Sequence, residues 1–322
     1  MKQDWNNFIE KVEAQPTEIK VGGDSPIEFN NPLPCPDFEK LLPEYFKNRD
    51  SSKLMDTKTG EVFRLSQSFI VSLRQALIEG SCLRKLWFVS VERAAPRDYN
   101  STVAMQKGNL FEKKVSGAND YYGEEPQPIL TATGRVSKTE NERIDVNAKH
   151  AIETLKRNGI DVNDKEKFKA DFRIKYKCFD GALDILWDEK LIKDLKYSGV
   201  LKEDKWSDYS WNKENVGASF GKILQACQYS LLFLLKFGFK APFSYLVYSS
   251  KEVGVYEEFN VNISEERLNM TKWLWIDTAK LFQNMINENK FVENPSFENC
   301  KRCPVMDCKV RQKYRNVIEV DI

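Results

Sequence analysis

The residues best suited to chemistry lie in two short apolar segments near the middle of the chain. Asp184 interrupts the apolar run 181–187, and Asp194 and Lys196 interrupt the next run, 191–197. Charged side chains are almost never fully buried unless they are paired or bind a metal ion. Two carboxylates and a lysine on one face of a sheet could hold a divalent cation and orient a water molecule. This is the chemistry of metal-assisted hydrolysis.

Whether the two carboxylates meet depends on the turn between the segments. A two-residue loop would pair Trp187 with Lys190 and leave the carboxylates on opposite faces of the sheet. A three-residue loop would pair Trp187 with Leu191, and would set Asp184 directly across from Asp194 with their Cβ atoms about 5 Å apart. We predict this second register or an equivalent bulge, with the lysine two residues later on the same face. Carboxylates on opposite faces would rule out the metal site.

Other patterned segments would have to position these residues. Apolar residues at helical spacing, with serine or glycine at several ends, predict helices that begin after Ser66 and cover residues 82–88, 104–118, 145–158, 219–237 and 264–289. Strict alternation predicts a half-buried strand over 168–178, which forms an antiparallel meander with strands 179–187 and 191–197. A closing strand pair is expected at 243–248 and 253–261. Residues 119–143 read as loop with some extended structure.

The loop 198–215 interleaves lysines with aromatic residues and supports two interpretations. Its members of this kind are Lys202, Lys205, Trp206, Tyr209, Trp211 and Lys213. Such a mixture suits a channel for single-stranded nucleic acid, in which bases stack on rings and phosphates meet lysines. The rings could equally pin a long loop to the core.

Composition excludes several functional classes. The 322 residues carry 49 Lys and Arg against 48 Asp and Glu, so any basic surface for nucleic acid must be local. The one histidine, His150, leaves no route to a histidine pair or a Ser-His-Asp triad. No apolar run approaches the roughly 20 residues that span a bilayer, and the N-terminus lacks a signal-peptide pattern. We therefore expect a cytoplasmic protein with no membrane partner.

Three of the seven cysteines crowd into nine residues near the end of the chain. Cys300, Cys303 and Cys308 lie in an irregular segment, whereas the remaining cysteines are scattered. Closely spaced thiolates in a cytosolic chain indicate a soft metal ion or an iron–sulfur cluster rather than disulfides. Tetrahedral coordination requires a fourth ligand. Cys82 is the best candidate, because a helix break precedes it and basic residues follow it.

Six short motifs follow one another in an order that resembles the RecB-like PD-(D/E)XK nucleases. They are Ser66-x-Ser68, Cys82-x-Arg84-Lys85-x-x-Phe88, Gly108-x-x-x-Glu112, Gly181-x-x-Asp184, Asp194-x-Lys196 and Gln225-x-x-x-Tyr229. The pattern of one cysteine followed by three is similar to the iron–sulfur subgroup, which includes the CRISPR-associated exonucleases and the AddB nuclease domain. The resemblance covers about residues 64–312. One departure is Glu112, where the CRISPR-associated group usually carries histidine.

The resemblance implies a fold, an activity and a set of site residues. The fold would be α/β, a restriction-endonuclease-like αβββαβ core in which helices flank a mixed sheet. An N-terminal helical region and the C-terminal cysteine segment would close an iron–sulfur site. The nuclease domain would span residues 61–312, followed by a tail at 313–322. Residues 1–60 lie outside the resemblance, and their prolines and weak periodicity predict an irregular extension with a short helix near 38–46.

The activity implied is that of a deoxyribonuclease dependent on Mg²⁺ or Mn²⁺, acting as an exonuclease on DNA ends or single strands. Asp184, Asp194, Glu112 and the Leu195 carbonyl would bind the cation, and Lys196 would orient or help to deprotonate the attacking water. Gln225 and Tyr229 would position the DNA. Cys82, Cys300, Cys303 and Cys308 would bind a structural [4Fe-4S] cluster or, alternatively, Zn²⁺.

Two questions of partnership stay open in the sequence. The chain could act as a homo-oligomer or beside a recombination, CRISPR or replication protein, because it lacks a Gly-x4-Gly-Lys-Ser/Thr loop for a helicase motor. It could also be a non-catalytic DNA-binding or assembly subunit that retains the nuclease fold.

Overall fold

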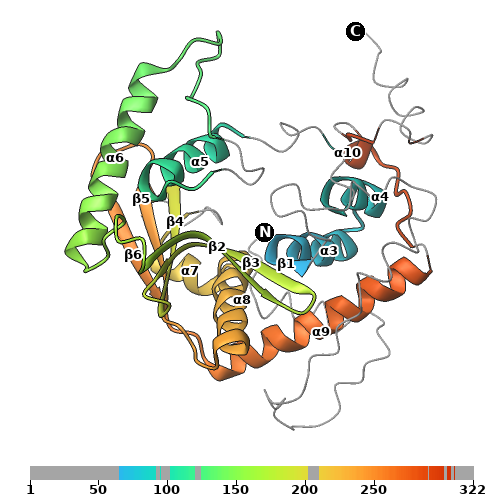
Figure 1. The fold of residues 1–322 in the computed structure, drawn as a ribbon. Helices are drawn as coiled ribbons and strands as arrows, with labels where there is room; N and C mark the ends of the chain where they lie inside the picture. Colours follow the sequence, from blue (N-terminus) through green and yellow to red (C-terminus); the bar gives the residue numbers. More distant parts are fainter. Residues whose placement is uncertain are drawn as a thin grey trace. The chain divides into compact units, whose positions relative to one another are not determined.

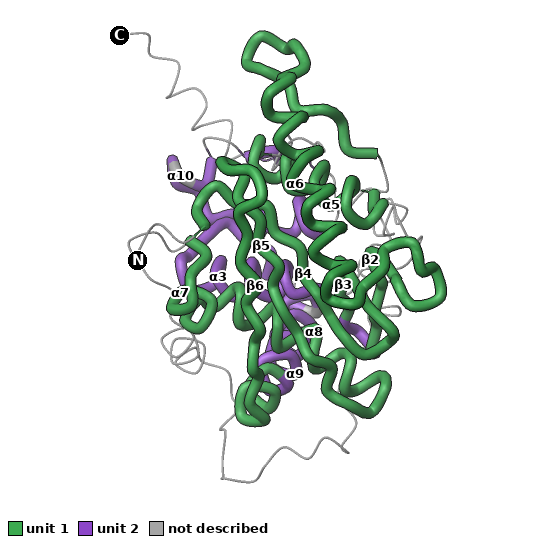
Figure 2. Tube along the Cα trace, turned by 90° about the vertical axis from the view of Figure 1, so that its left-hand side faces the viewer, with its two compact units in different colours: residues 1–8, 101–176, 180–271 green, residues 9–100, 177–179, 272–322 purple. Residues whose placement is uncertain are grey.

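A computed structural model describes residues 65–91, 95, 102–119, 125–201, 210–288, 290–300, 303–305 and 308. These residues divide into two compact units (Figure 2). Unit 1 contains residues 102–176 and 180–271, and unit 2 contains residues 65–95, 177–179 and those from 272 onward. The predicted extension 1–60 with its helix at 38–46, and the tail 313–322, lie outside the described residues. No described helix is long and apolar enough to cross a membrane.

Unit 1 is built on a mixed sheet. Its strands are β2 (Phe168–Tyr176), β3 (Phe179–Trp187), β4 (Leu191–Ser198), β5 (Phe243–Ser249) and β6 (Tyr256–Val261). Strand β2 pairs with β3. The pairs β3–β4 and β5–β6 are antiparallel, whereas β4 and β5 form a parallel pair. Parallel neighbours need a long crossover, and helix α8 (Phe220–Phe237) lies in the connection between them. The predicted mixed sheet is confirmed.

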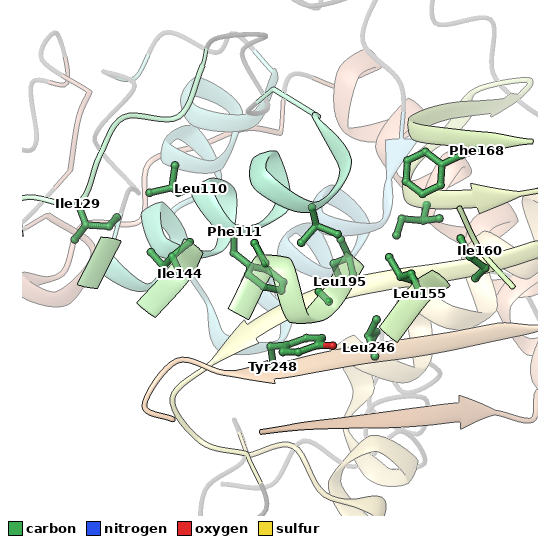
Figure 3. Packing of buried hydrophobic residues seen from close by; sticks show 14 residues of the cluster. Leu110, Phe111, Ile129, Ile144, Leu155, Ile160, Phe168, Leu195, Leu246 and Tyr248 are labelled. Carbon is green, nitrogen blue, oxygen red and sulfur yellow. The ribbon is translucent and has the colours of Figure 1, made fainter. Parts of the chain in front are cut away.

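Helices cover both faces of this sheet (Figure 1). Helices α5 (Val103–Ser116) and α6 (Lys138–Arg157) pack on one face through a cluster of buried apolar side chains that includes Phe111, Leu195 and Tyr248 (Figure 3). Helix α8 contacts the other face, to which α7 (Lys213–Ala218) leads. This arrangement follows the αβββαβ order that the motifs predicted.

Unit 2 gathers elements from distant parts of the chain around an aromatic core. It contains β1 (Leu65–Ser66), α3 (Gln67–Glu79), α4 (Leu83–Leu86), a π-helical turn (Trp87–Val91), the end of α9 (Glu265–Asn287) and α10 (Phe297–Cys300). The ring of Phe282 from α9 lies 5.1 Å from Phe69 and 6.1 Å from Trp87, measured between centroids. A buried ion pair between Arg74 and Asp277 also joins α3 to α9.

Most elements match the sequence analysis to within about two residues, although α7 begins inside the stretch expected to be loop. Three larger differences in boundaries have clear reasons. Helix α6 begins at Lys138 rather than Asp145, because its first two turns are polar and show no apolar period. The helix expected over 82–88 is split into α4 and the π-helical turn. Strand β6 begins at Tyr256 rather than Val253, since the backbone N–H of Gly254 donates to the Asn147 side chain instead of a neighbouring strand.

Candidate active site

The turn between β3 and β4 pairs Trp187 with Leu191, which is the register expected from the sequence. Asp188 and Glu189 both have left-handed backbones, with φ of 49° and 52°, and the Lys190 N–H donates to the Trp187 carbonyl at 3.0 Å. This is the twist of a type I′ turn. Lys190 is then passed over as a bulge, so Trp187 pairs with Leu191.

The same register continues toward the two aspartates. Ile185 pairs with Lys193, and Asp184 and Asp194 are the next residues on their strands. The Cα pairs end at Ile185 and Lys193, one residue before the two aspartates. The predicted pairing of Trp187 with Leu191 is therefore confirmed. Its physical cause is a two-residue turn followed by one bulged residue, which together act as the three-residue loop expected from the sequence.

Backbone and side-chain contacts fix both carboxylates. The Leu195 N–H donates to Asp184 Oδ2 at 2.8 Å, and Lys196 Nζ lies 3.7 Å from the same oxygen. Lys196 also forms an ion pair with Asp194 Oδ2, and the Asp194 side chain is completely buried. One ammonium thus bridges two carboxylates. Asp184 lies on β3, and Asp194 and Lys196 lie on β4, so the pairing of these two strands sets the positions of all three side chains.

Helix α8 supplies the next contacts. Gln225 Nε2 donates to Asp194 Oδ1 at 3.0 Å and lies 3.4 Å from the Tyr229 hydroxyl. Gln225 and Tyr229 are four residues apart, so they share one face of the helix. The structure brings both predicted residues to the carboxylates, and shows that Gln225 directly contacts Asp194.

Gly181 allows α8 to approach β3 this closely. A Cβ atom at this position would lie 2.8 Å from Cε1 of Tyr229 and 3.1 Å from Cδ1 of Leu232. Real Cβ atoms essentially never approach neighbours at the first of these distances. The glycine of the Gly181-x-x-Asp184 motif is thus explained by the packing of Tyr229 against the strand.

Glu112, on α5, is electrostatically part of the same group. Burial and the charge of Asp184 raise the pKa of Glu112 to about 8, and Asp194 adds to the shift. A charge on Glu112 is therefore disfavoured by the two strand-borne carboxylates. The resemblance predicted Glu112 as a metal ligand, and helix α5 brings this half-buried side chain close enough for its charge to interact with the strand carboxylates.

The strand carboxylates show the same electrostatic pattern. Burial and the charge of Asp184 raise the pKa of Asp194 to about 7, and burial raises the pKa of Asp184 as well. Burial opposes the charge on Lys196, but the two aspartates outweigh it and raise the pKa of the ammonium. Three carboxylates surround one cation, so the group carries excess negative charge that further positive charge would relieve.

The donor set of this group suits a hard divalent cation. Carboxylate oxygens, together with a backbone carbonyl such as that of Leu195, are ligands that Mg²⁺ and Mn²⁺ prefer. In the part of the chain that the structure describes, no three Asp, Glu, His or Cys side chains are arranged as a ready metal site. Asp184 and Asp194 point their oxygens at Lys196, the Leu195 N–H and the Gln225 amide instead.

The structure adds one carboxylate that sequence reasoning missed. Asp171, on β2, has a left-handed backbone with φ of 46°, and its charge contributes to the raised pKa of both Glu112 and Asp184. Arg173 Nε lies 3.7 Å from Asp171 Oδ1. Asp171 falls on the polar side of a strictly alternating strand, so nothing in the sequence distinguishes it from a solvated residue.

The aromatic loop is described only at residues 198–201 and 210–215, and its described aromatic residue, Trp211, belongs to the core. Trp211 is buried and packs edge-on against Tyr245, with Lys222 Nζ 4.5 Å from its ring centroid. This favours the interpretation in which the rings pin the loop. Lys213 begins α7, and the predicted channel residues Lys202, Lys205, Trp206 and Tyr209 lie outside the described residues.

The cysteines predicted to bind a cluster all belong to unit 2. Cys82 precedes α4, Cys300 ends α10, Cys303 is buried and Cys308 is half-buried. The chain before Cys300 lies against the chain around Cys82: the Arg84 N–H donates to the Val292 carbonyl at 3.2 Å, and Asn294 donates to the Gly80 carbonyl. The segments that carry the thiols are therefore neighbours, although the described thiols form no ready metal site.

Comparison with known proteins gives a fold. No protein-family model matches the chain, and no curated protein matches it. Among solved structures, it is similar to the crystal structure of a "Putative exonuclease" from Eubacterium rectale, with a TM-score of 0.50 and 15% sequence identity. The similarity covers 82% of this chain and 92% of the other. At 15% identity the similarity between the two proteins is one of fold alone.

Proposed function

We propose that the protein is a metal-dependent deoxyribonuclease, an exonuclease that hydrolyses phosphodiester bonds at DNA ends or in single strands. The observation that carries the proposal is the convergence of Asp184, Asp194 and Lys196 on two adjacent strands. Glu112 and Gln225 join them from helices on either face of the sheet. The fold shared with a protein named as an exonuclease supports the same activity class.

Each residue has a role that follows from its contacts. Asp184, Asp194, Glu112 and the Leu195 carbonyl would hold Mg²⁺ or Mn²⁺, which when bound stabilises negative charge on the phosphate and lowers the pKa of water. Lys196 carries its proton between two carboxylates, so it donates hydrogen bonds and orients a water or phosphate oxygen. Gln225 holds Asp194, and Tyr229, whose pKa burial raises, stays neutral and can donate to the DNA strand.

The test is digestion of end-labelled DNA by the purified chain. Single- and double-stranded substrates, each linear and circular, would be incubated with Mg²⁺, Mn²⁺ or EDTA. We expect cleavage of linear substrates only, dependent on the cation. Replacement of Lys196 by Met should lower the rate by about a hundredfold or more, because the transition state loses a fixed positive charge. Lys190→Met, at the exposed turn of the same hairpin, is the matched control and should cleave normally.

Failure of the wild-type protein to cleave any substrate while still binding DNA would favour a non-catalytic DNA-binding or assembly subunit. Cleavage that persists undiminished in EDTA, or in the Lys196→Met variant, would contradict the proposed site. Retained cleavage of circular substrates would contradict the exonuclease assignment alone.

We further propose that Cys82, Cys300, Cys303 and Cys308 bind a structural [4Fe-4S] cluster. The support is the contact between the segments that carry them, through Arg84 and Val292. Such a cluster would tie the C-terminal segment to α4 within unit 2. A brown, air-sensitive preparation with stoichiometric iron and sulfide is expected, and a colourless preparation loaded with zinc would contradict the cluster and favour Zn²⁺.

A further inference from the structure

One buried tyrosine outside the sequence motifs contacts the residues that hold Asp194. Tyr245 is completely buried on β5, and the sheet register places it beside Asp194 on β4. Its hydroxyl donates to the Lys222 carbonyl at 2.6 Å and lies 3.4 Å from Gln225 Oε1. Tyr245 therefore contacts α8 at two points one turn apart, on the same face of the sheet as the Asp194 side chain.

These contacts form a chain that ends at the carboxylate. Gln225 Oε1 faces the Tyr245 hydroxyl, and Gln225 Nε2 donates to Asp194 Oδ1 at 3.0 Å. An amide has one acceptor end and one donor end, so fixing the oxygen fixes the direction of the NH₂ group. The Tyr245 hydroxyl shares its one proton between the Lys222 carbonyl and the more distant Gln225 Oε1 in a three-centre hydrogen bond, which favours the orientation in which the amide donor faces the carboxylate.

Neighbouring rings leave Tyr245 little freedom. Trp211 lies edge-on at 5.1 Å and Phe243 edge-on at 4.9 Å, both measured between ring centroids. Burial raises the pKa of the Tyr245 hydroxyl well above its usual value, so it remains a neutral donor. The hydroxyl is thus a fixed point from which the position of α8 and the Gln225 amide can be set.

We infer that Tyr245 is a positioning residue for the proposed nuclease reaction, acting through Gln225 to hold the Asp194 carboxylate. The inference rests on the proposed function for its kinetic consequence only. Residues that orient a metal ligand through a hydrogen bond typically contribute a factor of about 10 to 100 in metal affinity or activity. Tyr245 lies one hydrogen bond further from the proposed metal ligand Asp194 than Gln225 does, so the lower end of that range applies.

The test compares Tyr245→Phe with Tyr248→Phe. Both variants lose one buried hydroxyl from β5, but Tyr248 packs against Phe111 on the opposite face of the sheet. We expect Tyr245→Phe to lower kcat by about tenfold and to raise the half-saturating Mn²⁺ concentration. Tyr248→Phe should change either quantity by less than about twofold.

Two further measurements separate positioning from packing. In a Gln225→Ala background, Tyr245→Phe should lower kcat by less than about a further twofold, because coupled residues are not additive. Full additivity would overturn the inference, as would wild-type kinetics in Tyr245→Phe.

The second measurement, hydrogen exchange of the Gln225 side-chain amide by NMR, needs no activity. We expect exchange about tenfold faster in Tyr245→Phe than in wild type or Tyr248→Phe. If the wild-type protein cleaves no DNA, the proposed function fails and the exchange rates still decide the inference. Unchanged exchange in Tyr245→Phe would overturn the inference and leave the nuclease proposal standing.

Discussion

The carboxylate site of unit 1 and the cysteine segment of unit 2 are built in different ways. Asp184 and Asp194 lie on paired strands, and the Leu195 N–H, the Gln225 amide and the Lys196 ammonium hold their oxygens. Cys82 and Cys300 lie at the ends of four-residue helices, and Cys308 lies in irregular chain. Strand ladders locate a side chain without help from a ligand, whereas isolated turns depend on whatever the side chains bind. The comparison predicts that the first region determines chemistry and the second determines stability.

The largest expected effect is that of Asp184→Asn. We expect cleavage to fall by about a thousandfold or more, because a charged ligand of the proposed cation becomes a neutral amide. Stability should not decrease, since the change removes one negative charge from a crowded group. Cleavage assays and denaturant titrations measure the two effects.

The matched control for this change is Asp188→Asn, which alters the exposed turn four residues later. Asparagine tolerates the left-handed backbone found at Asp188, so wild-type behaviour is expected. Normal cleavage by Asp184→Asn would contradict the assignment of the reaction to the carboxylate site, and with it the contrast between the two regions.

Cys300→Ser should produce the largest loss of stability. Losing one ligand of a structural cluster or zinc ion should destabilise unit 2 by about 3 kcal/mol or more, since metal binding and folding are linked. Metal content and calorimetry of the variant provide the measurement.

Cys227→Ser is the control for the loss of metal. Burial raises the pKa of Cys227 to about 11, so its thiol is neutral and a poor metal ligand. Its iron and zinc content should equal that of the wild type. If Cys300→Ser abolished cleavage as completely as Asp184→Asn while the fold stayed intact, the division between chemistry and stability would be wrong.

Gly181→Ala should have an intermediate effect in unit 1. The added methyl group would meet Tyr229, and overpacking of this kind costs about 1 to 3 kcal/mol. Cleavage should fall as well, but less than in Asp184→Asn, because α8 must shift with Gln225. Gly221→Ala is the control: no atom within 4 Å would meet its Cβ, and alanine favours helix. Equal stability of the two variants would contradict the close packing of α8 on β3.

The smallest effect concerns pH. The folded-state pKa is about 7 for Asp194 and about 8 for Glu112, against roughly 4 for carboxyl groups in unfolded chains. Between these values the folded protein holds more protons than the unfolded protein, so the associated stability is present at low pH and lost as the pH rises through 7 and 8. In EDTA, we expect the free energy of unfolding to fall by about 1 to 3 kcal/mol between about pH 5.5 and pH 8. Denaturant titrations at both values measure it.

Added Mg²⁺ or Mn²⁺ should reverse this loss, because the cation replaces the protons. The variant Asp194→Asn should show a shallower pH dependence in EDTA. Stability that rises with pH over this interval would show that the carboxylates are not coupled as described.

Several parts of the molecule could be predicted from local sequence signals. Ser66 caps α3 by accepting from the Phe69 N–H, and Gly80 ends that helix with φ of 65°, as their residue types indicate. The alternation of β2 and the hairpin register also follow from local pattern. The start of α6 could not be predicted, because ion pairs such as Lys107–Glu140, and not an apolar stripe, support its first turns.

The sequence by itself predicted that Asp184, Asp194 and Lys196 meet on one hairpin, because register and side-chain alternation are local properties of a hairpin. The order of the motifs also predicted Glu112, Gln225 and Tyr229, whereas tertiary structure alone decided that Asp171 and Tyr245 join them. These two residues reach the carboxylates from two further strands, and each looks ordinary in its own segment. Their proximity depends on how elements far apart in sequence pack, which short-range pattern does not encode.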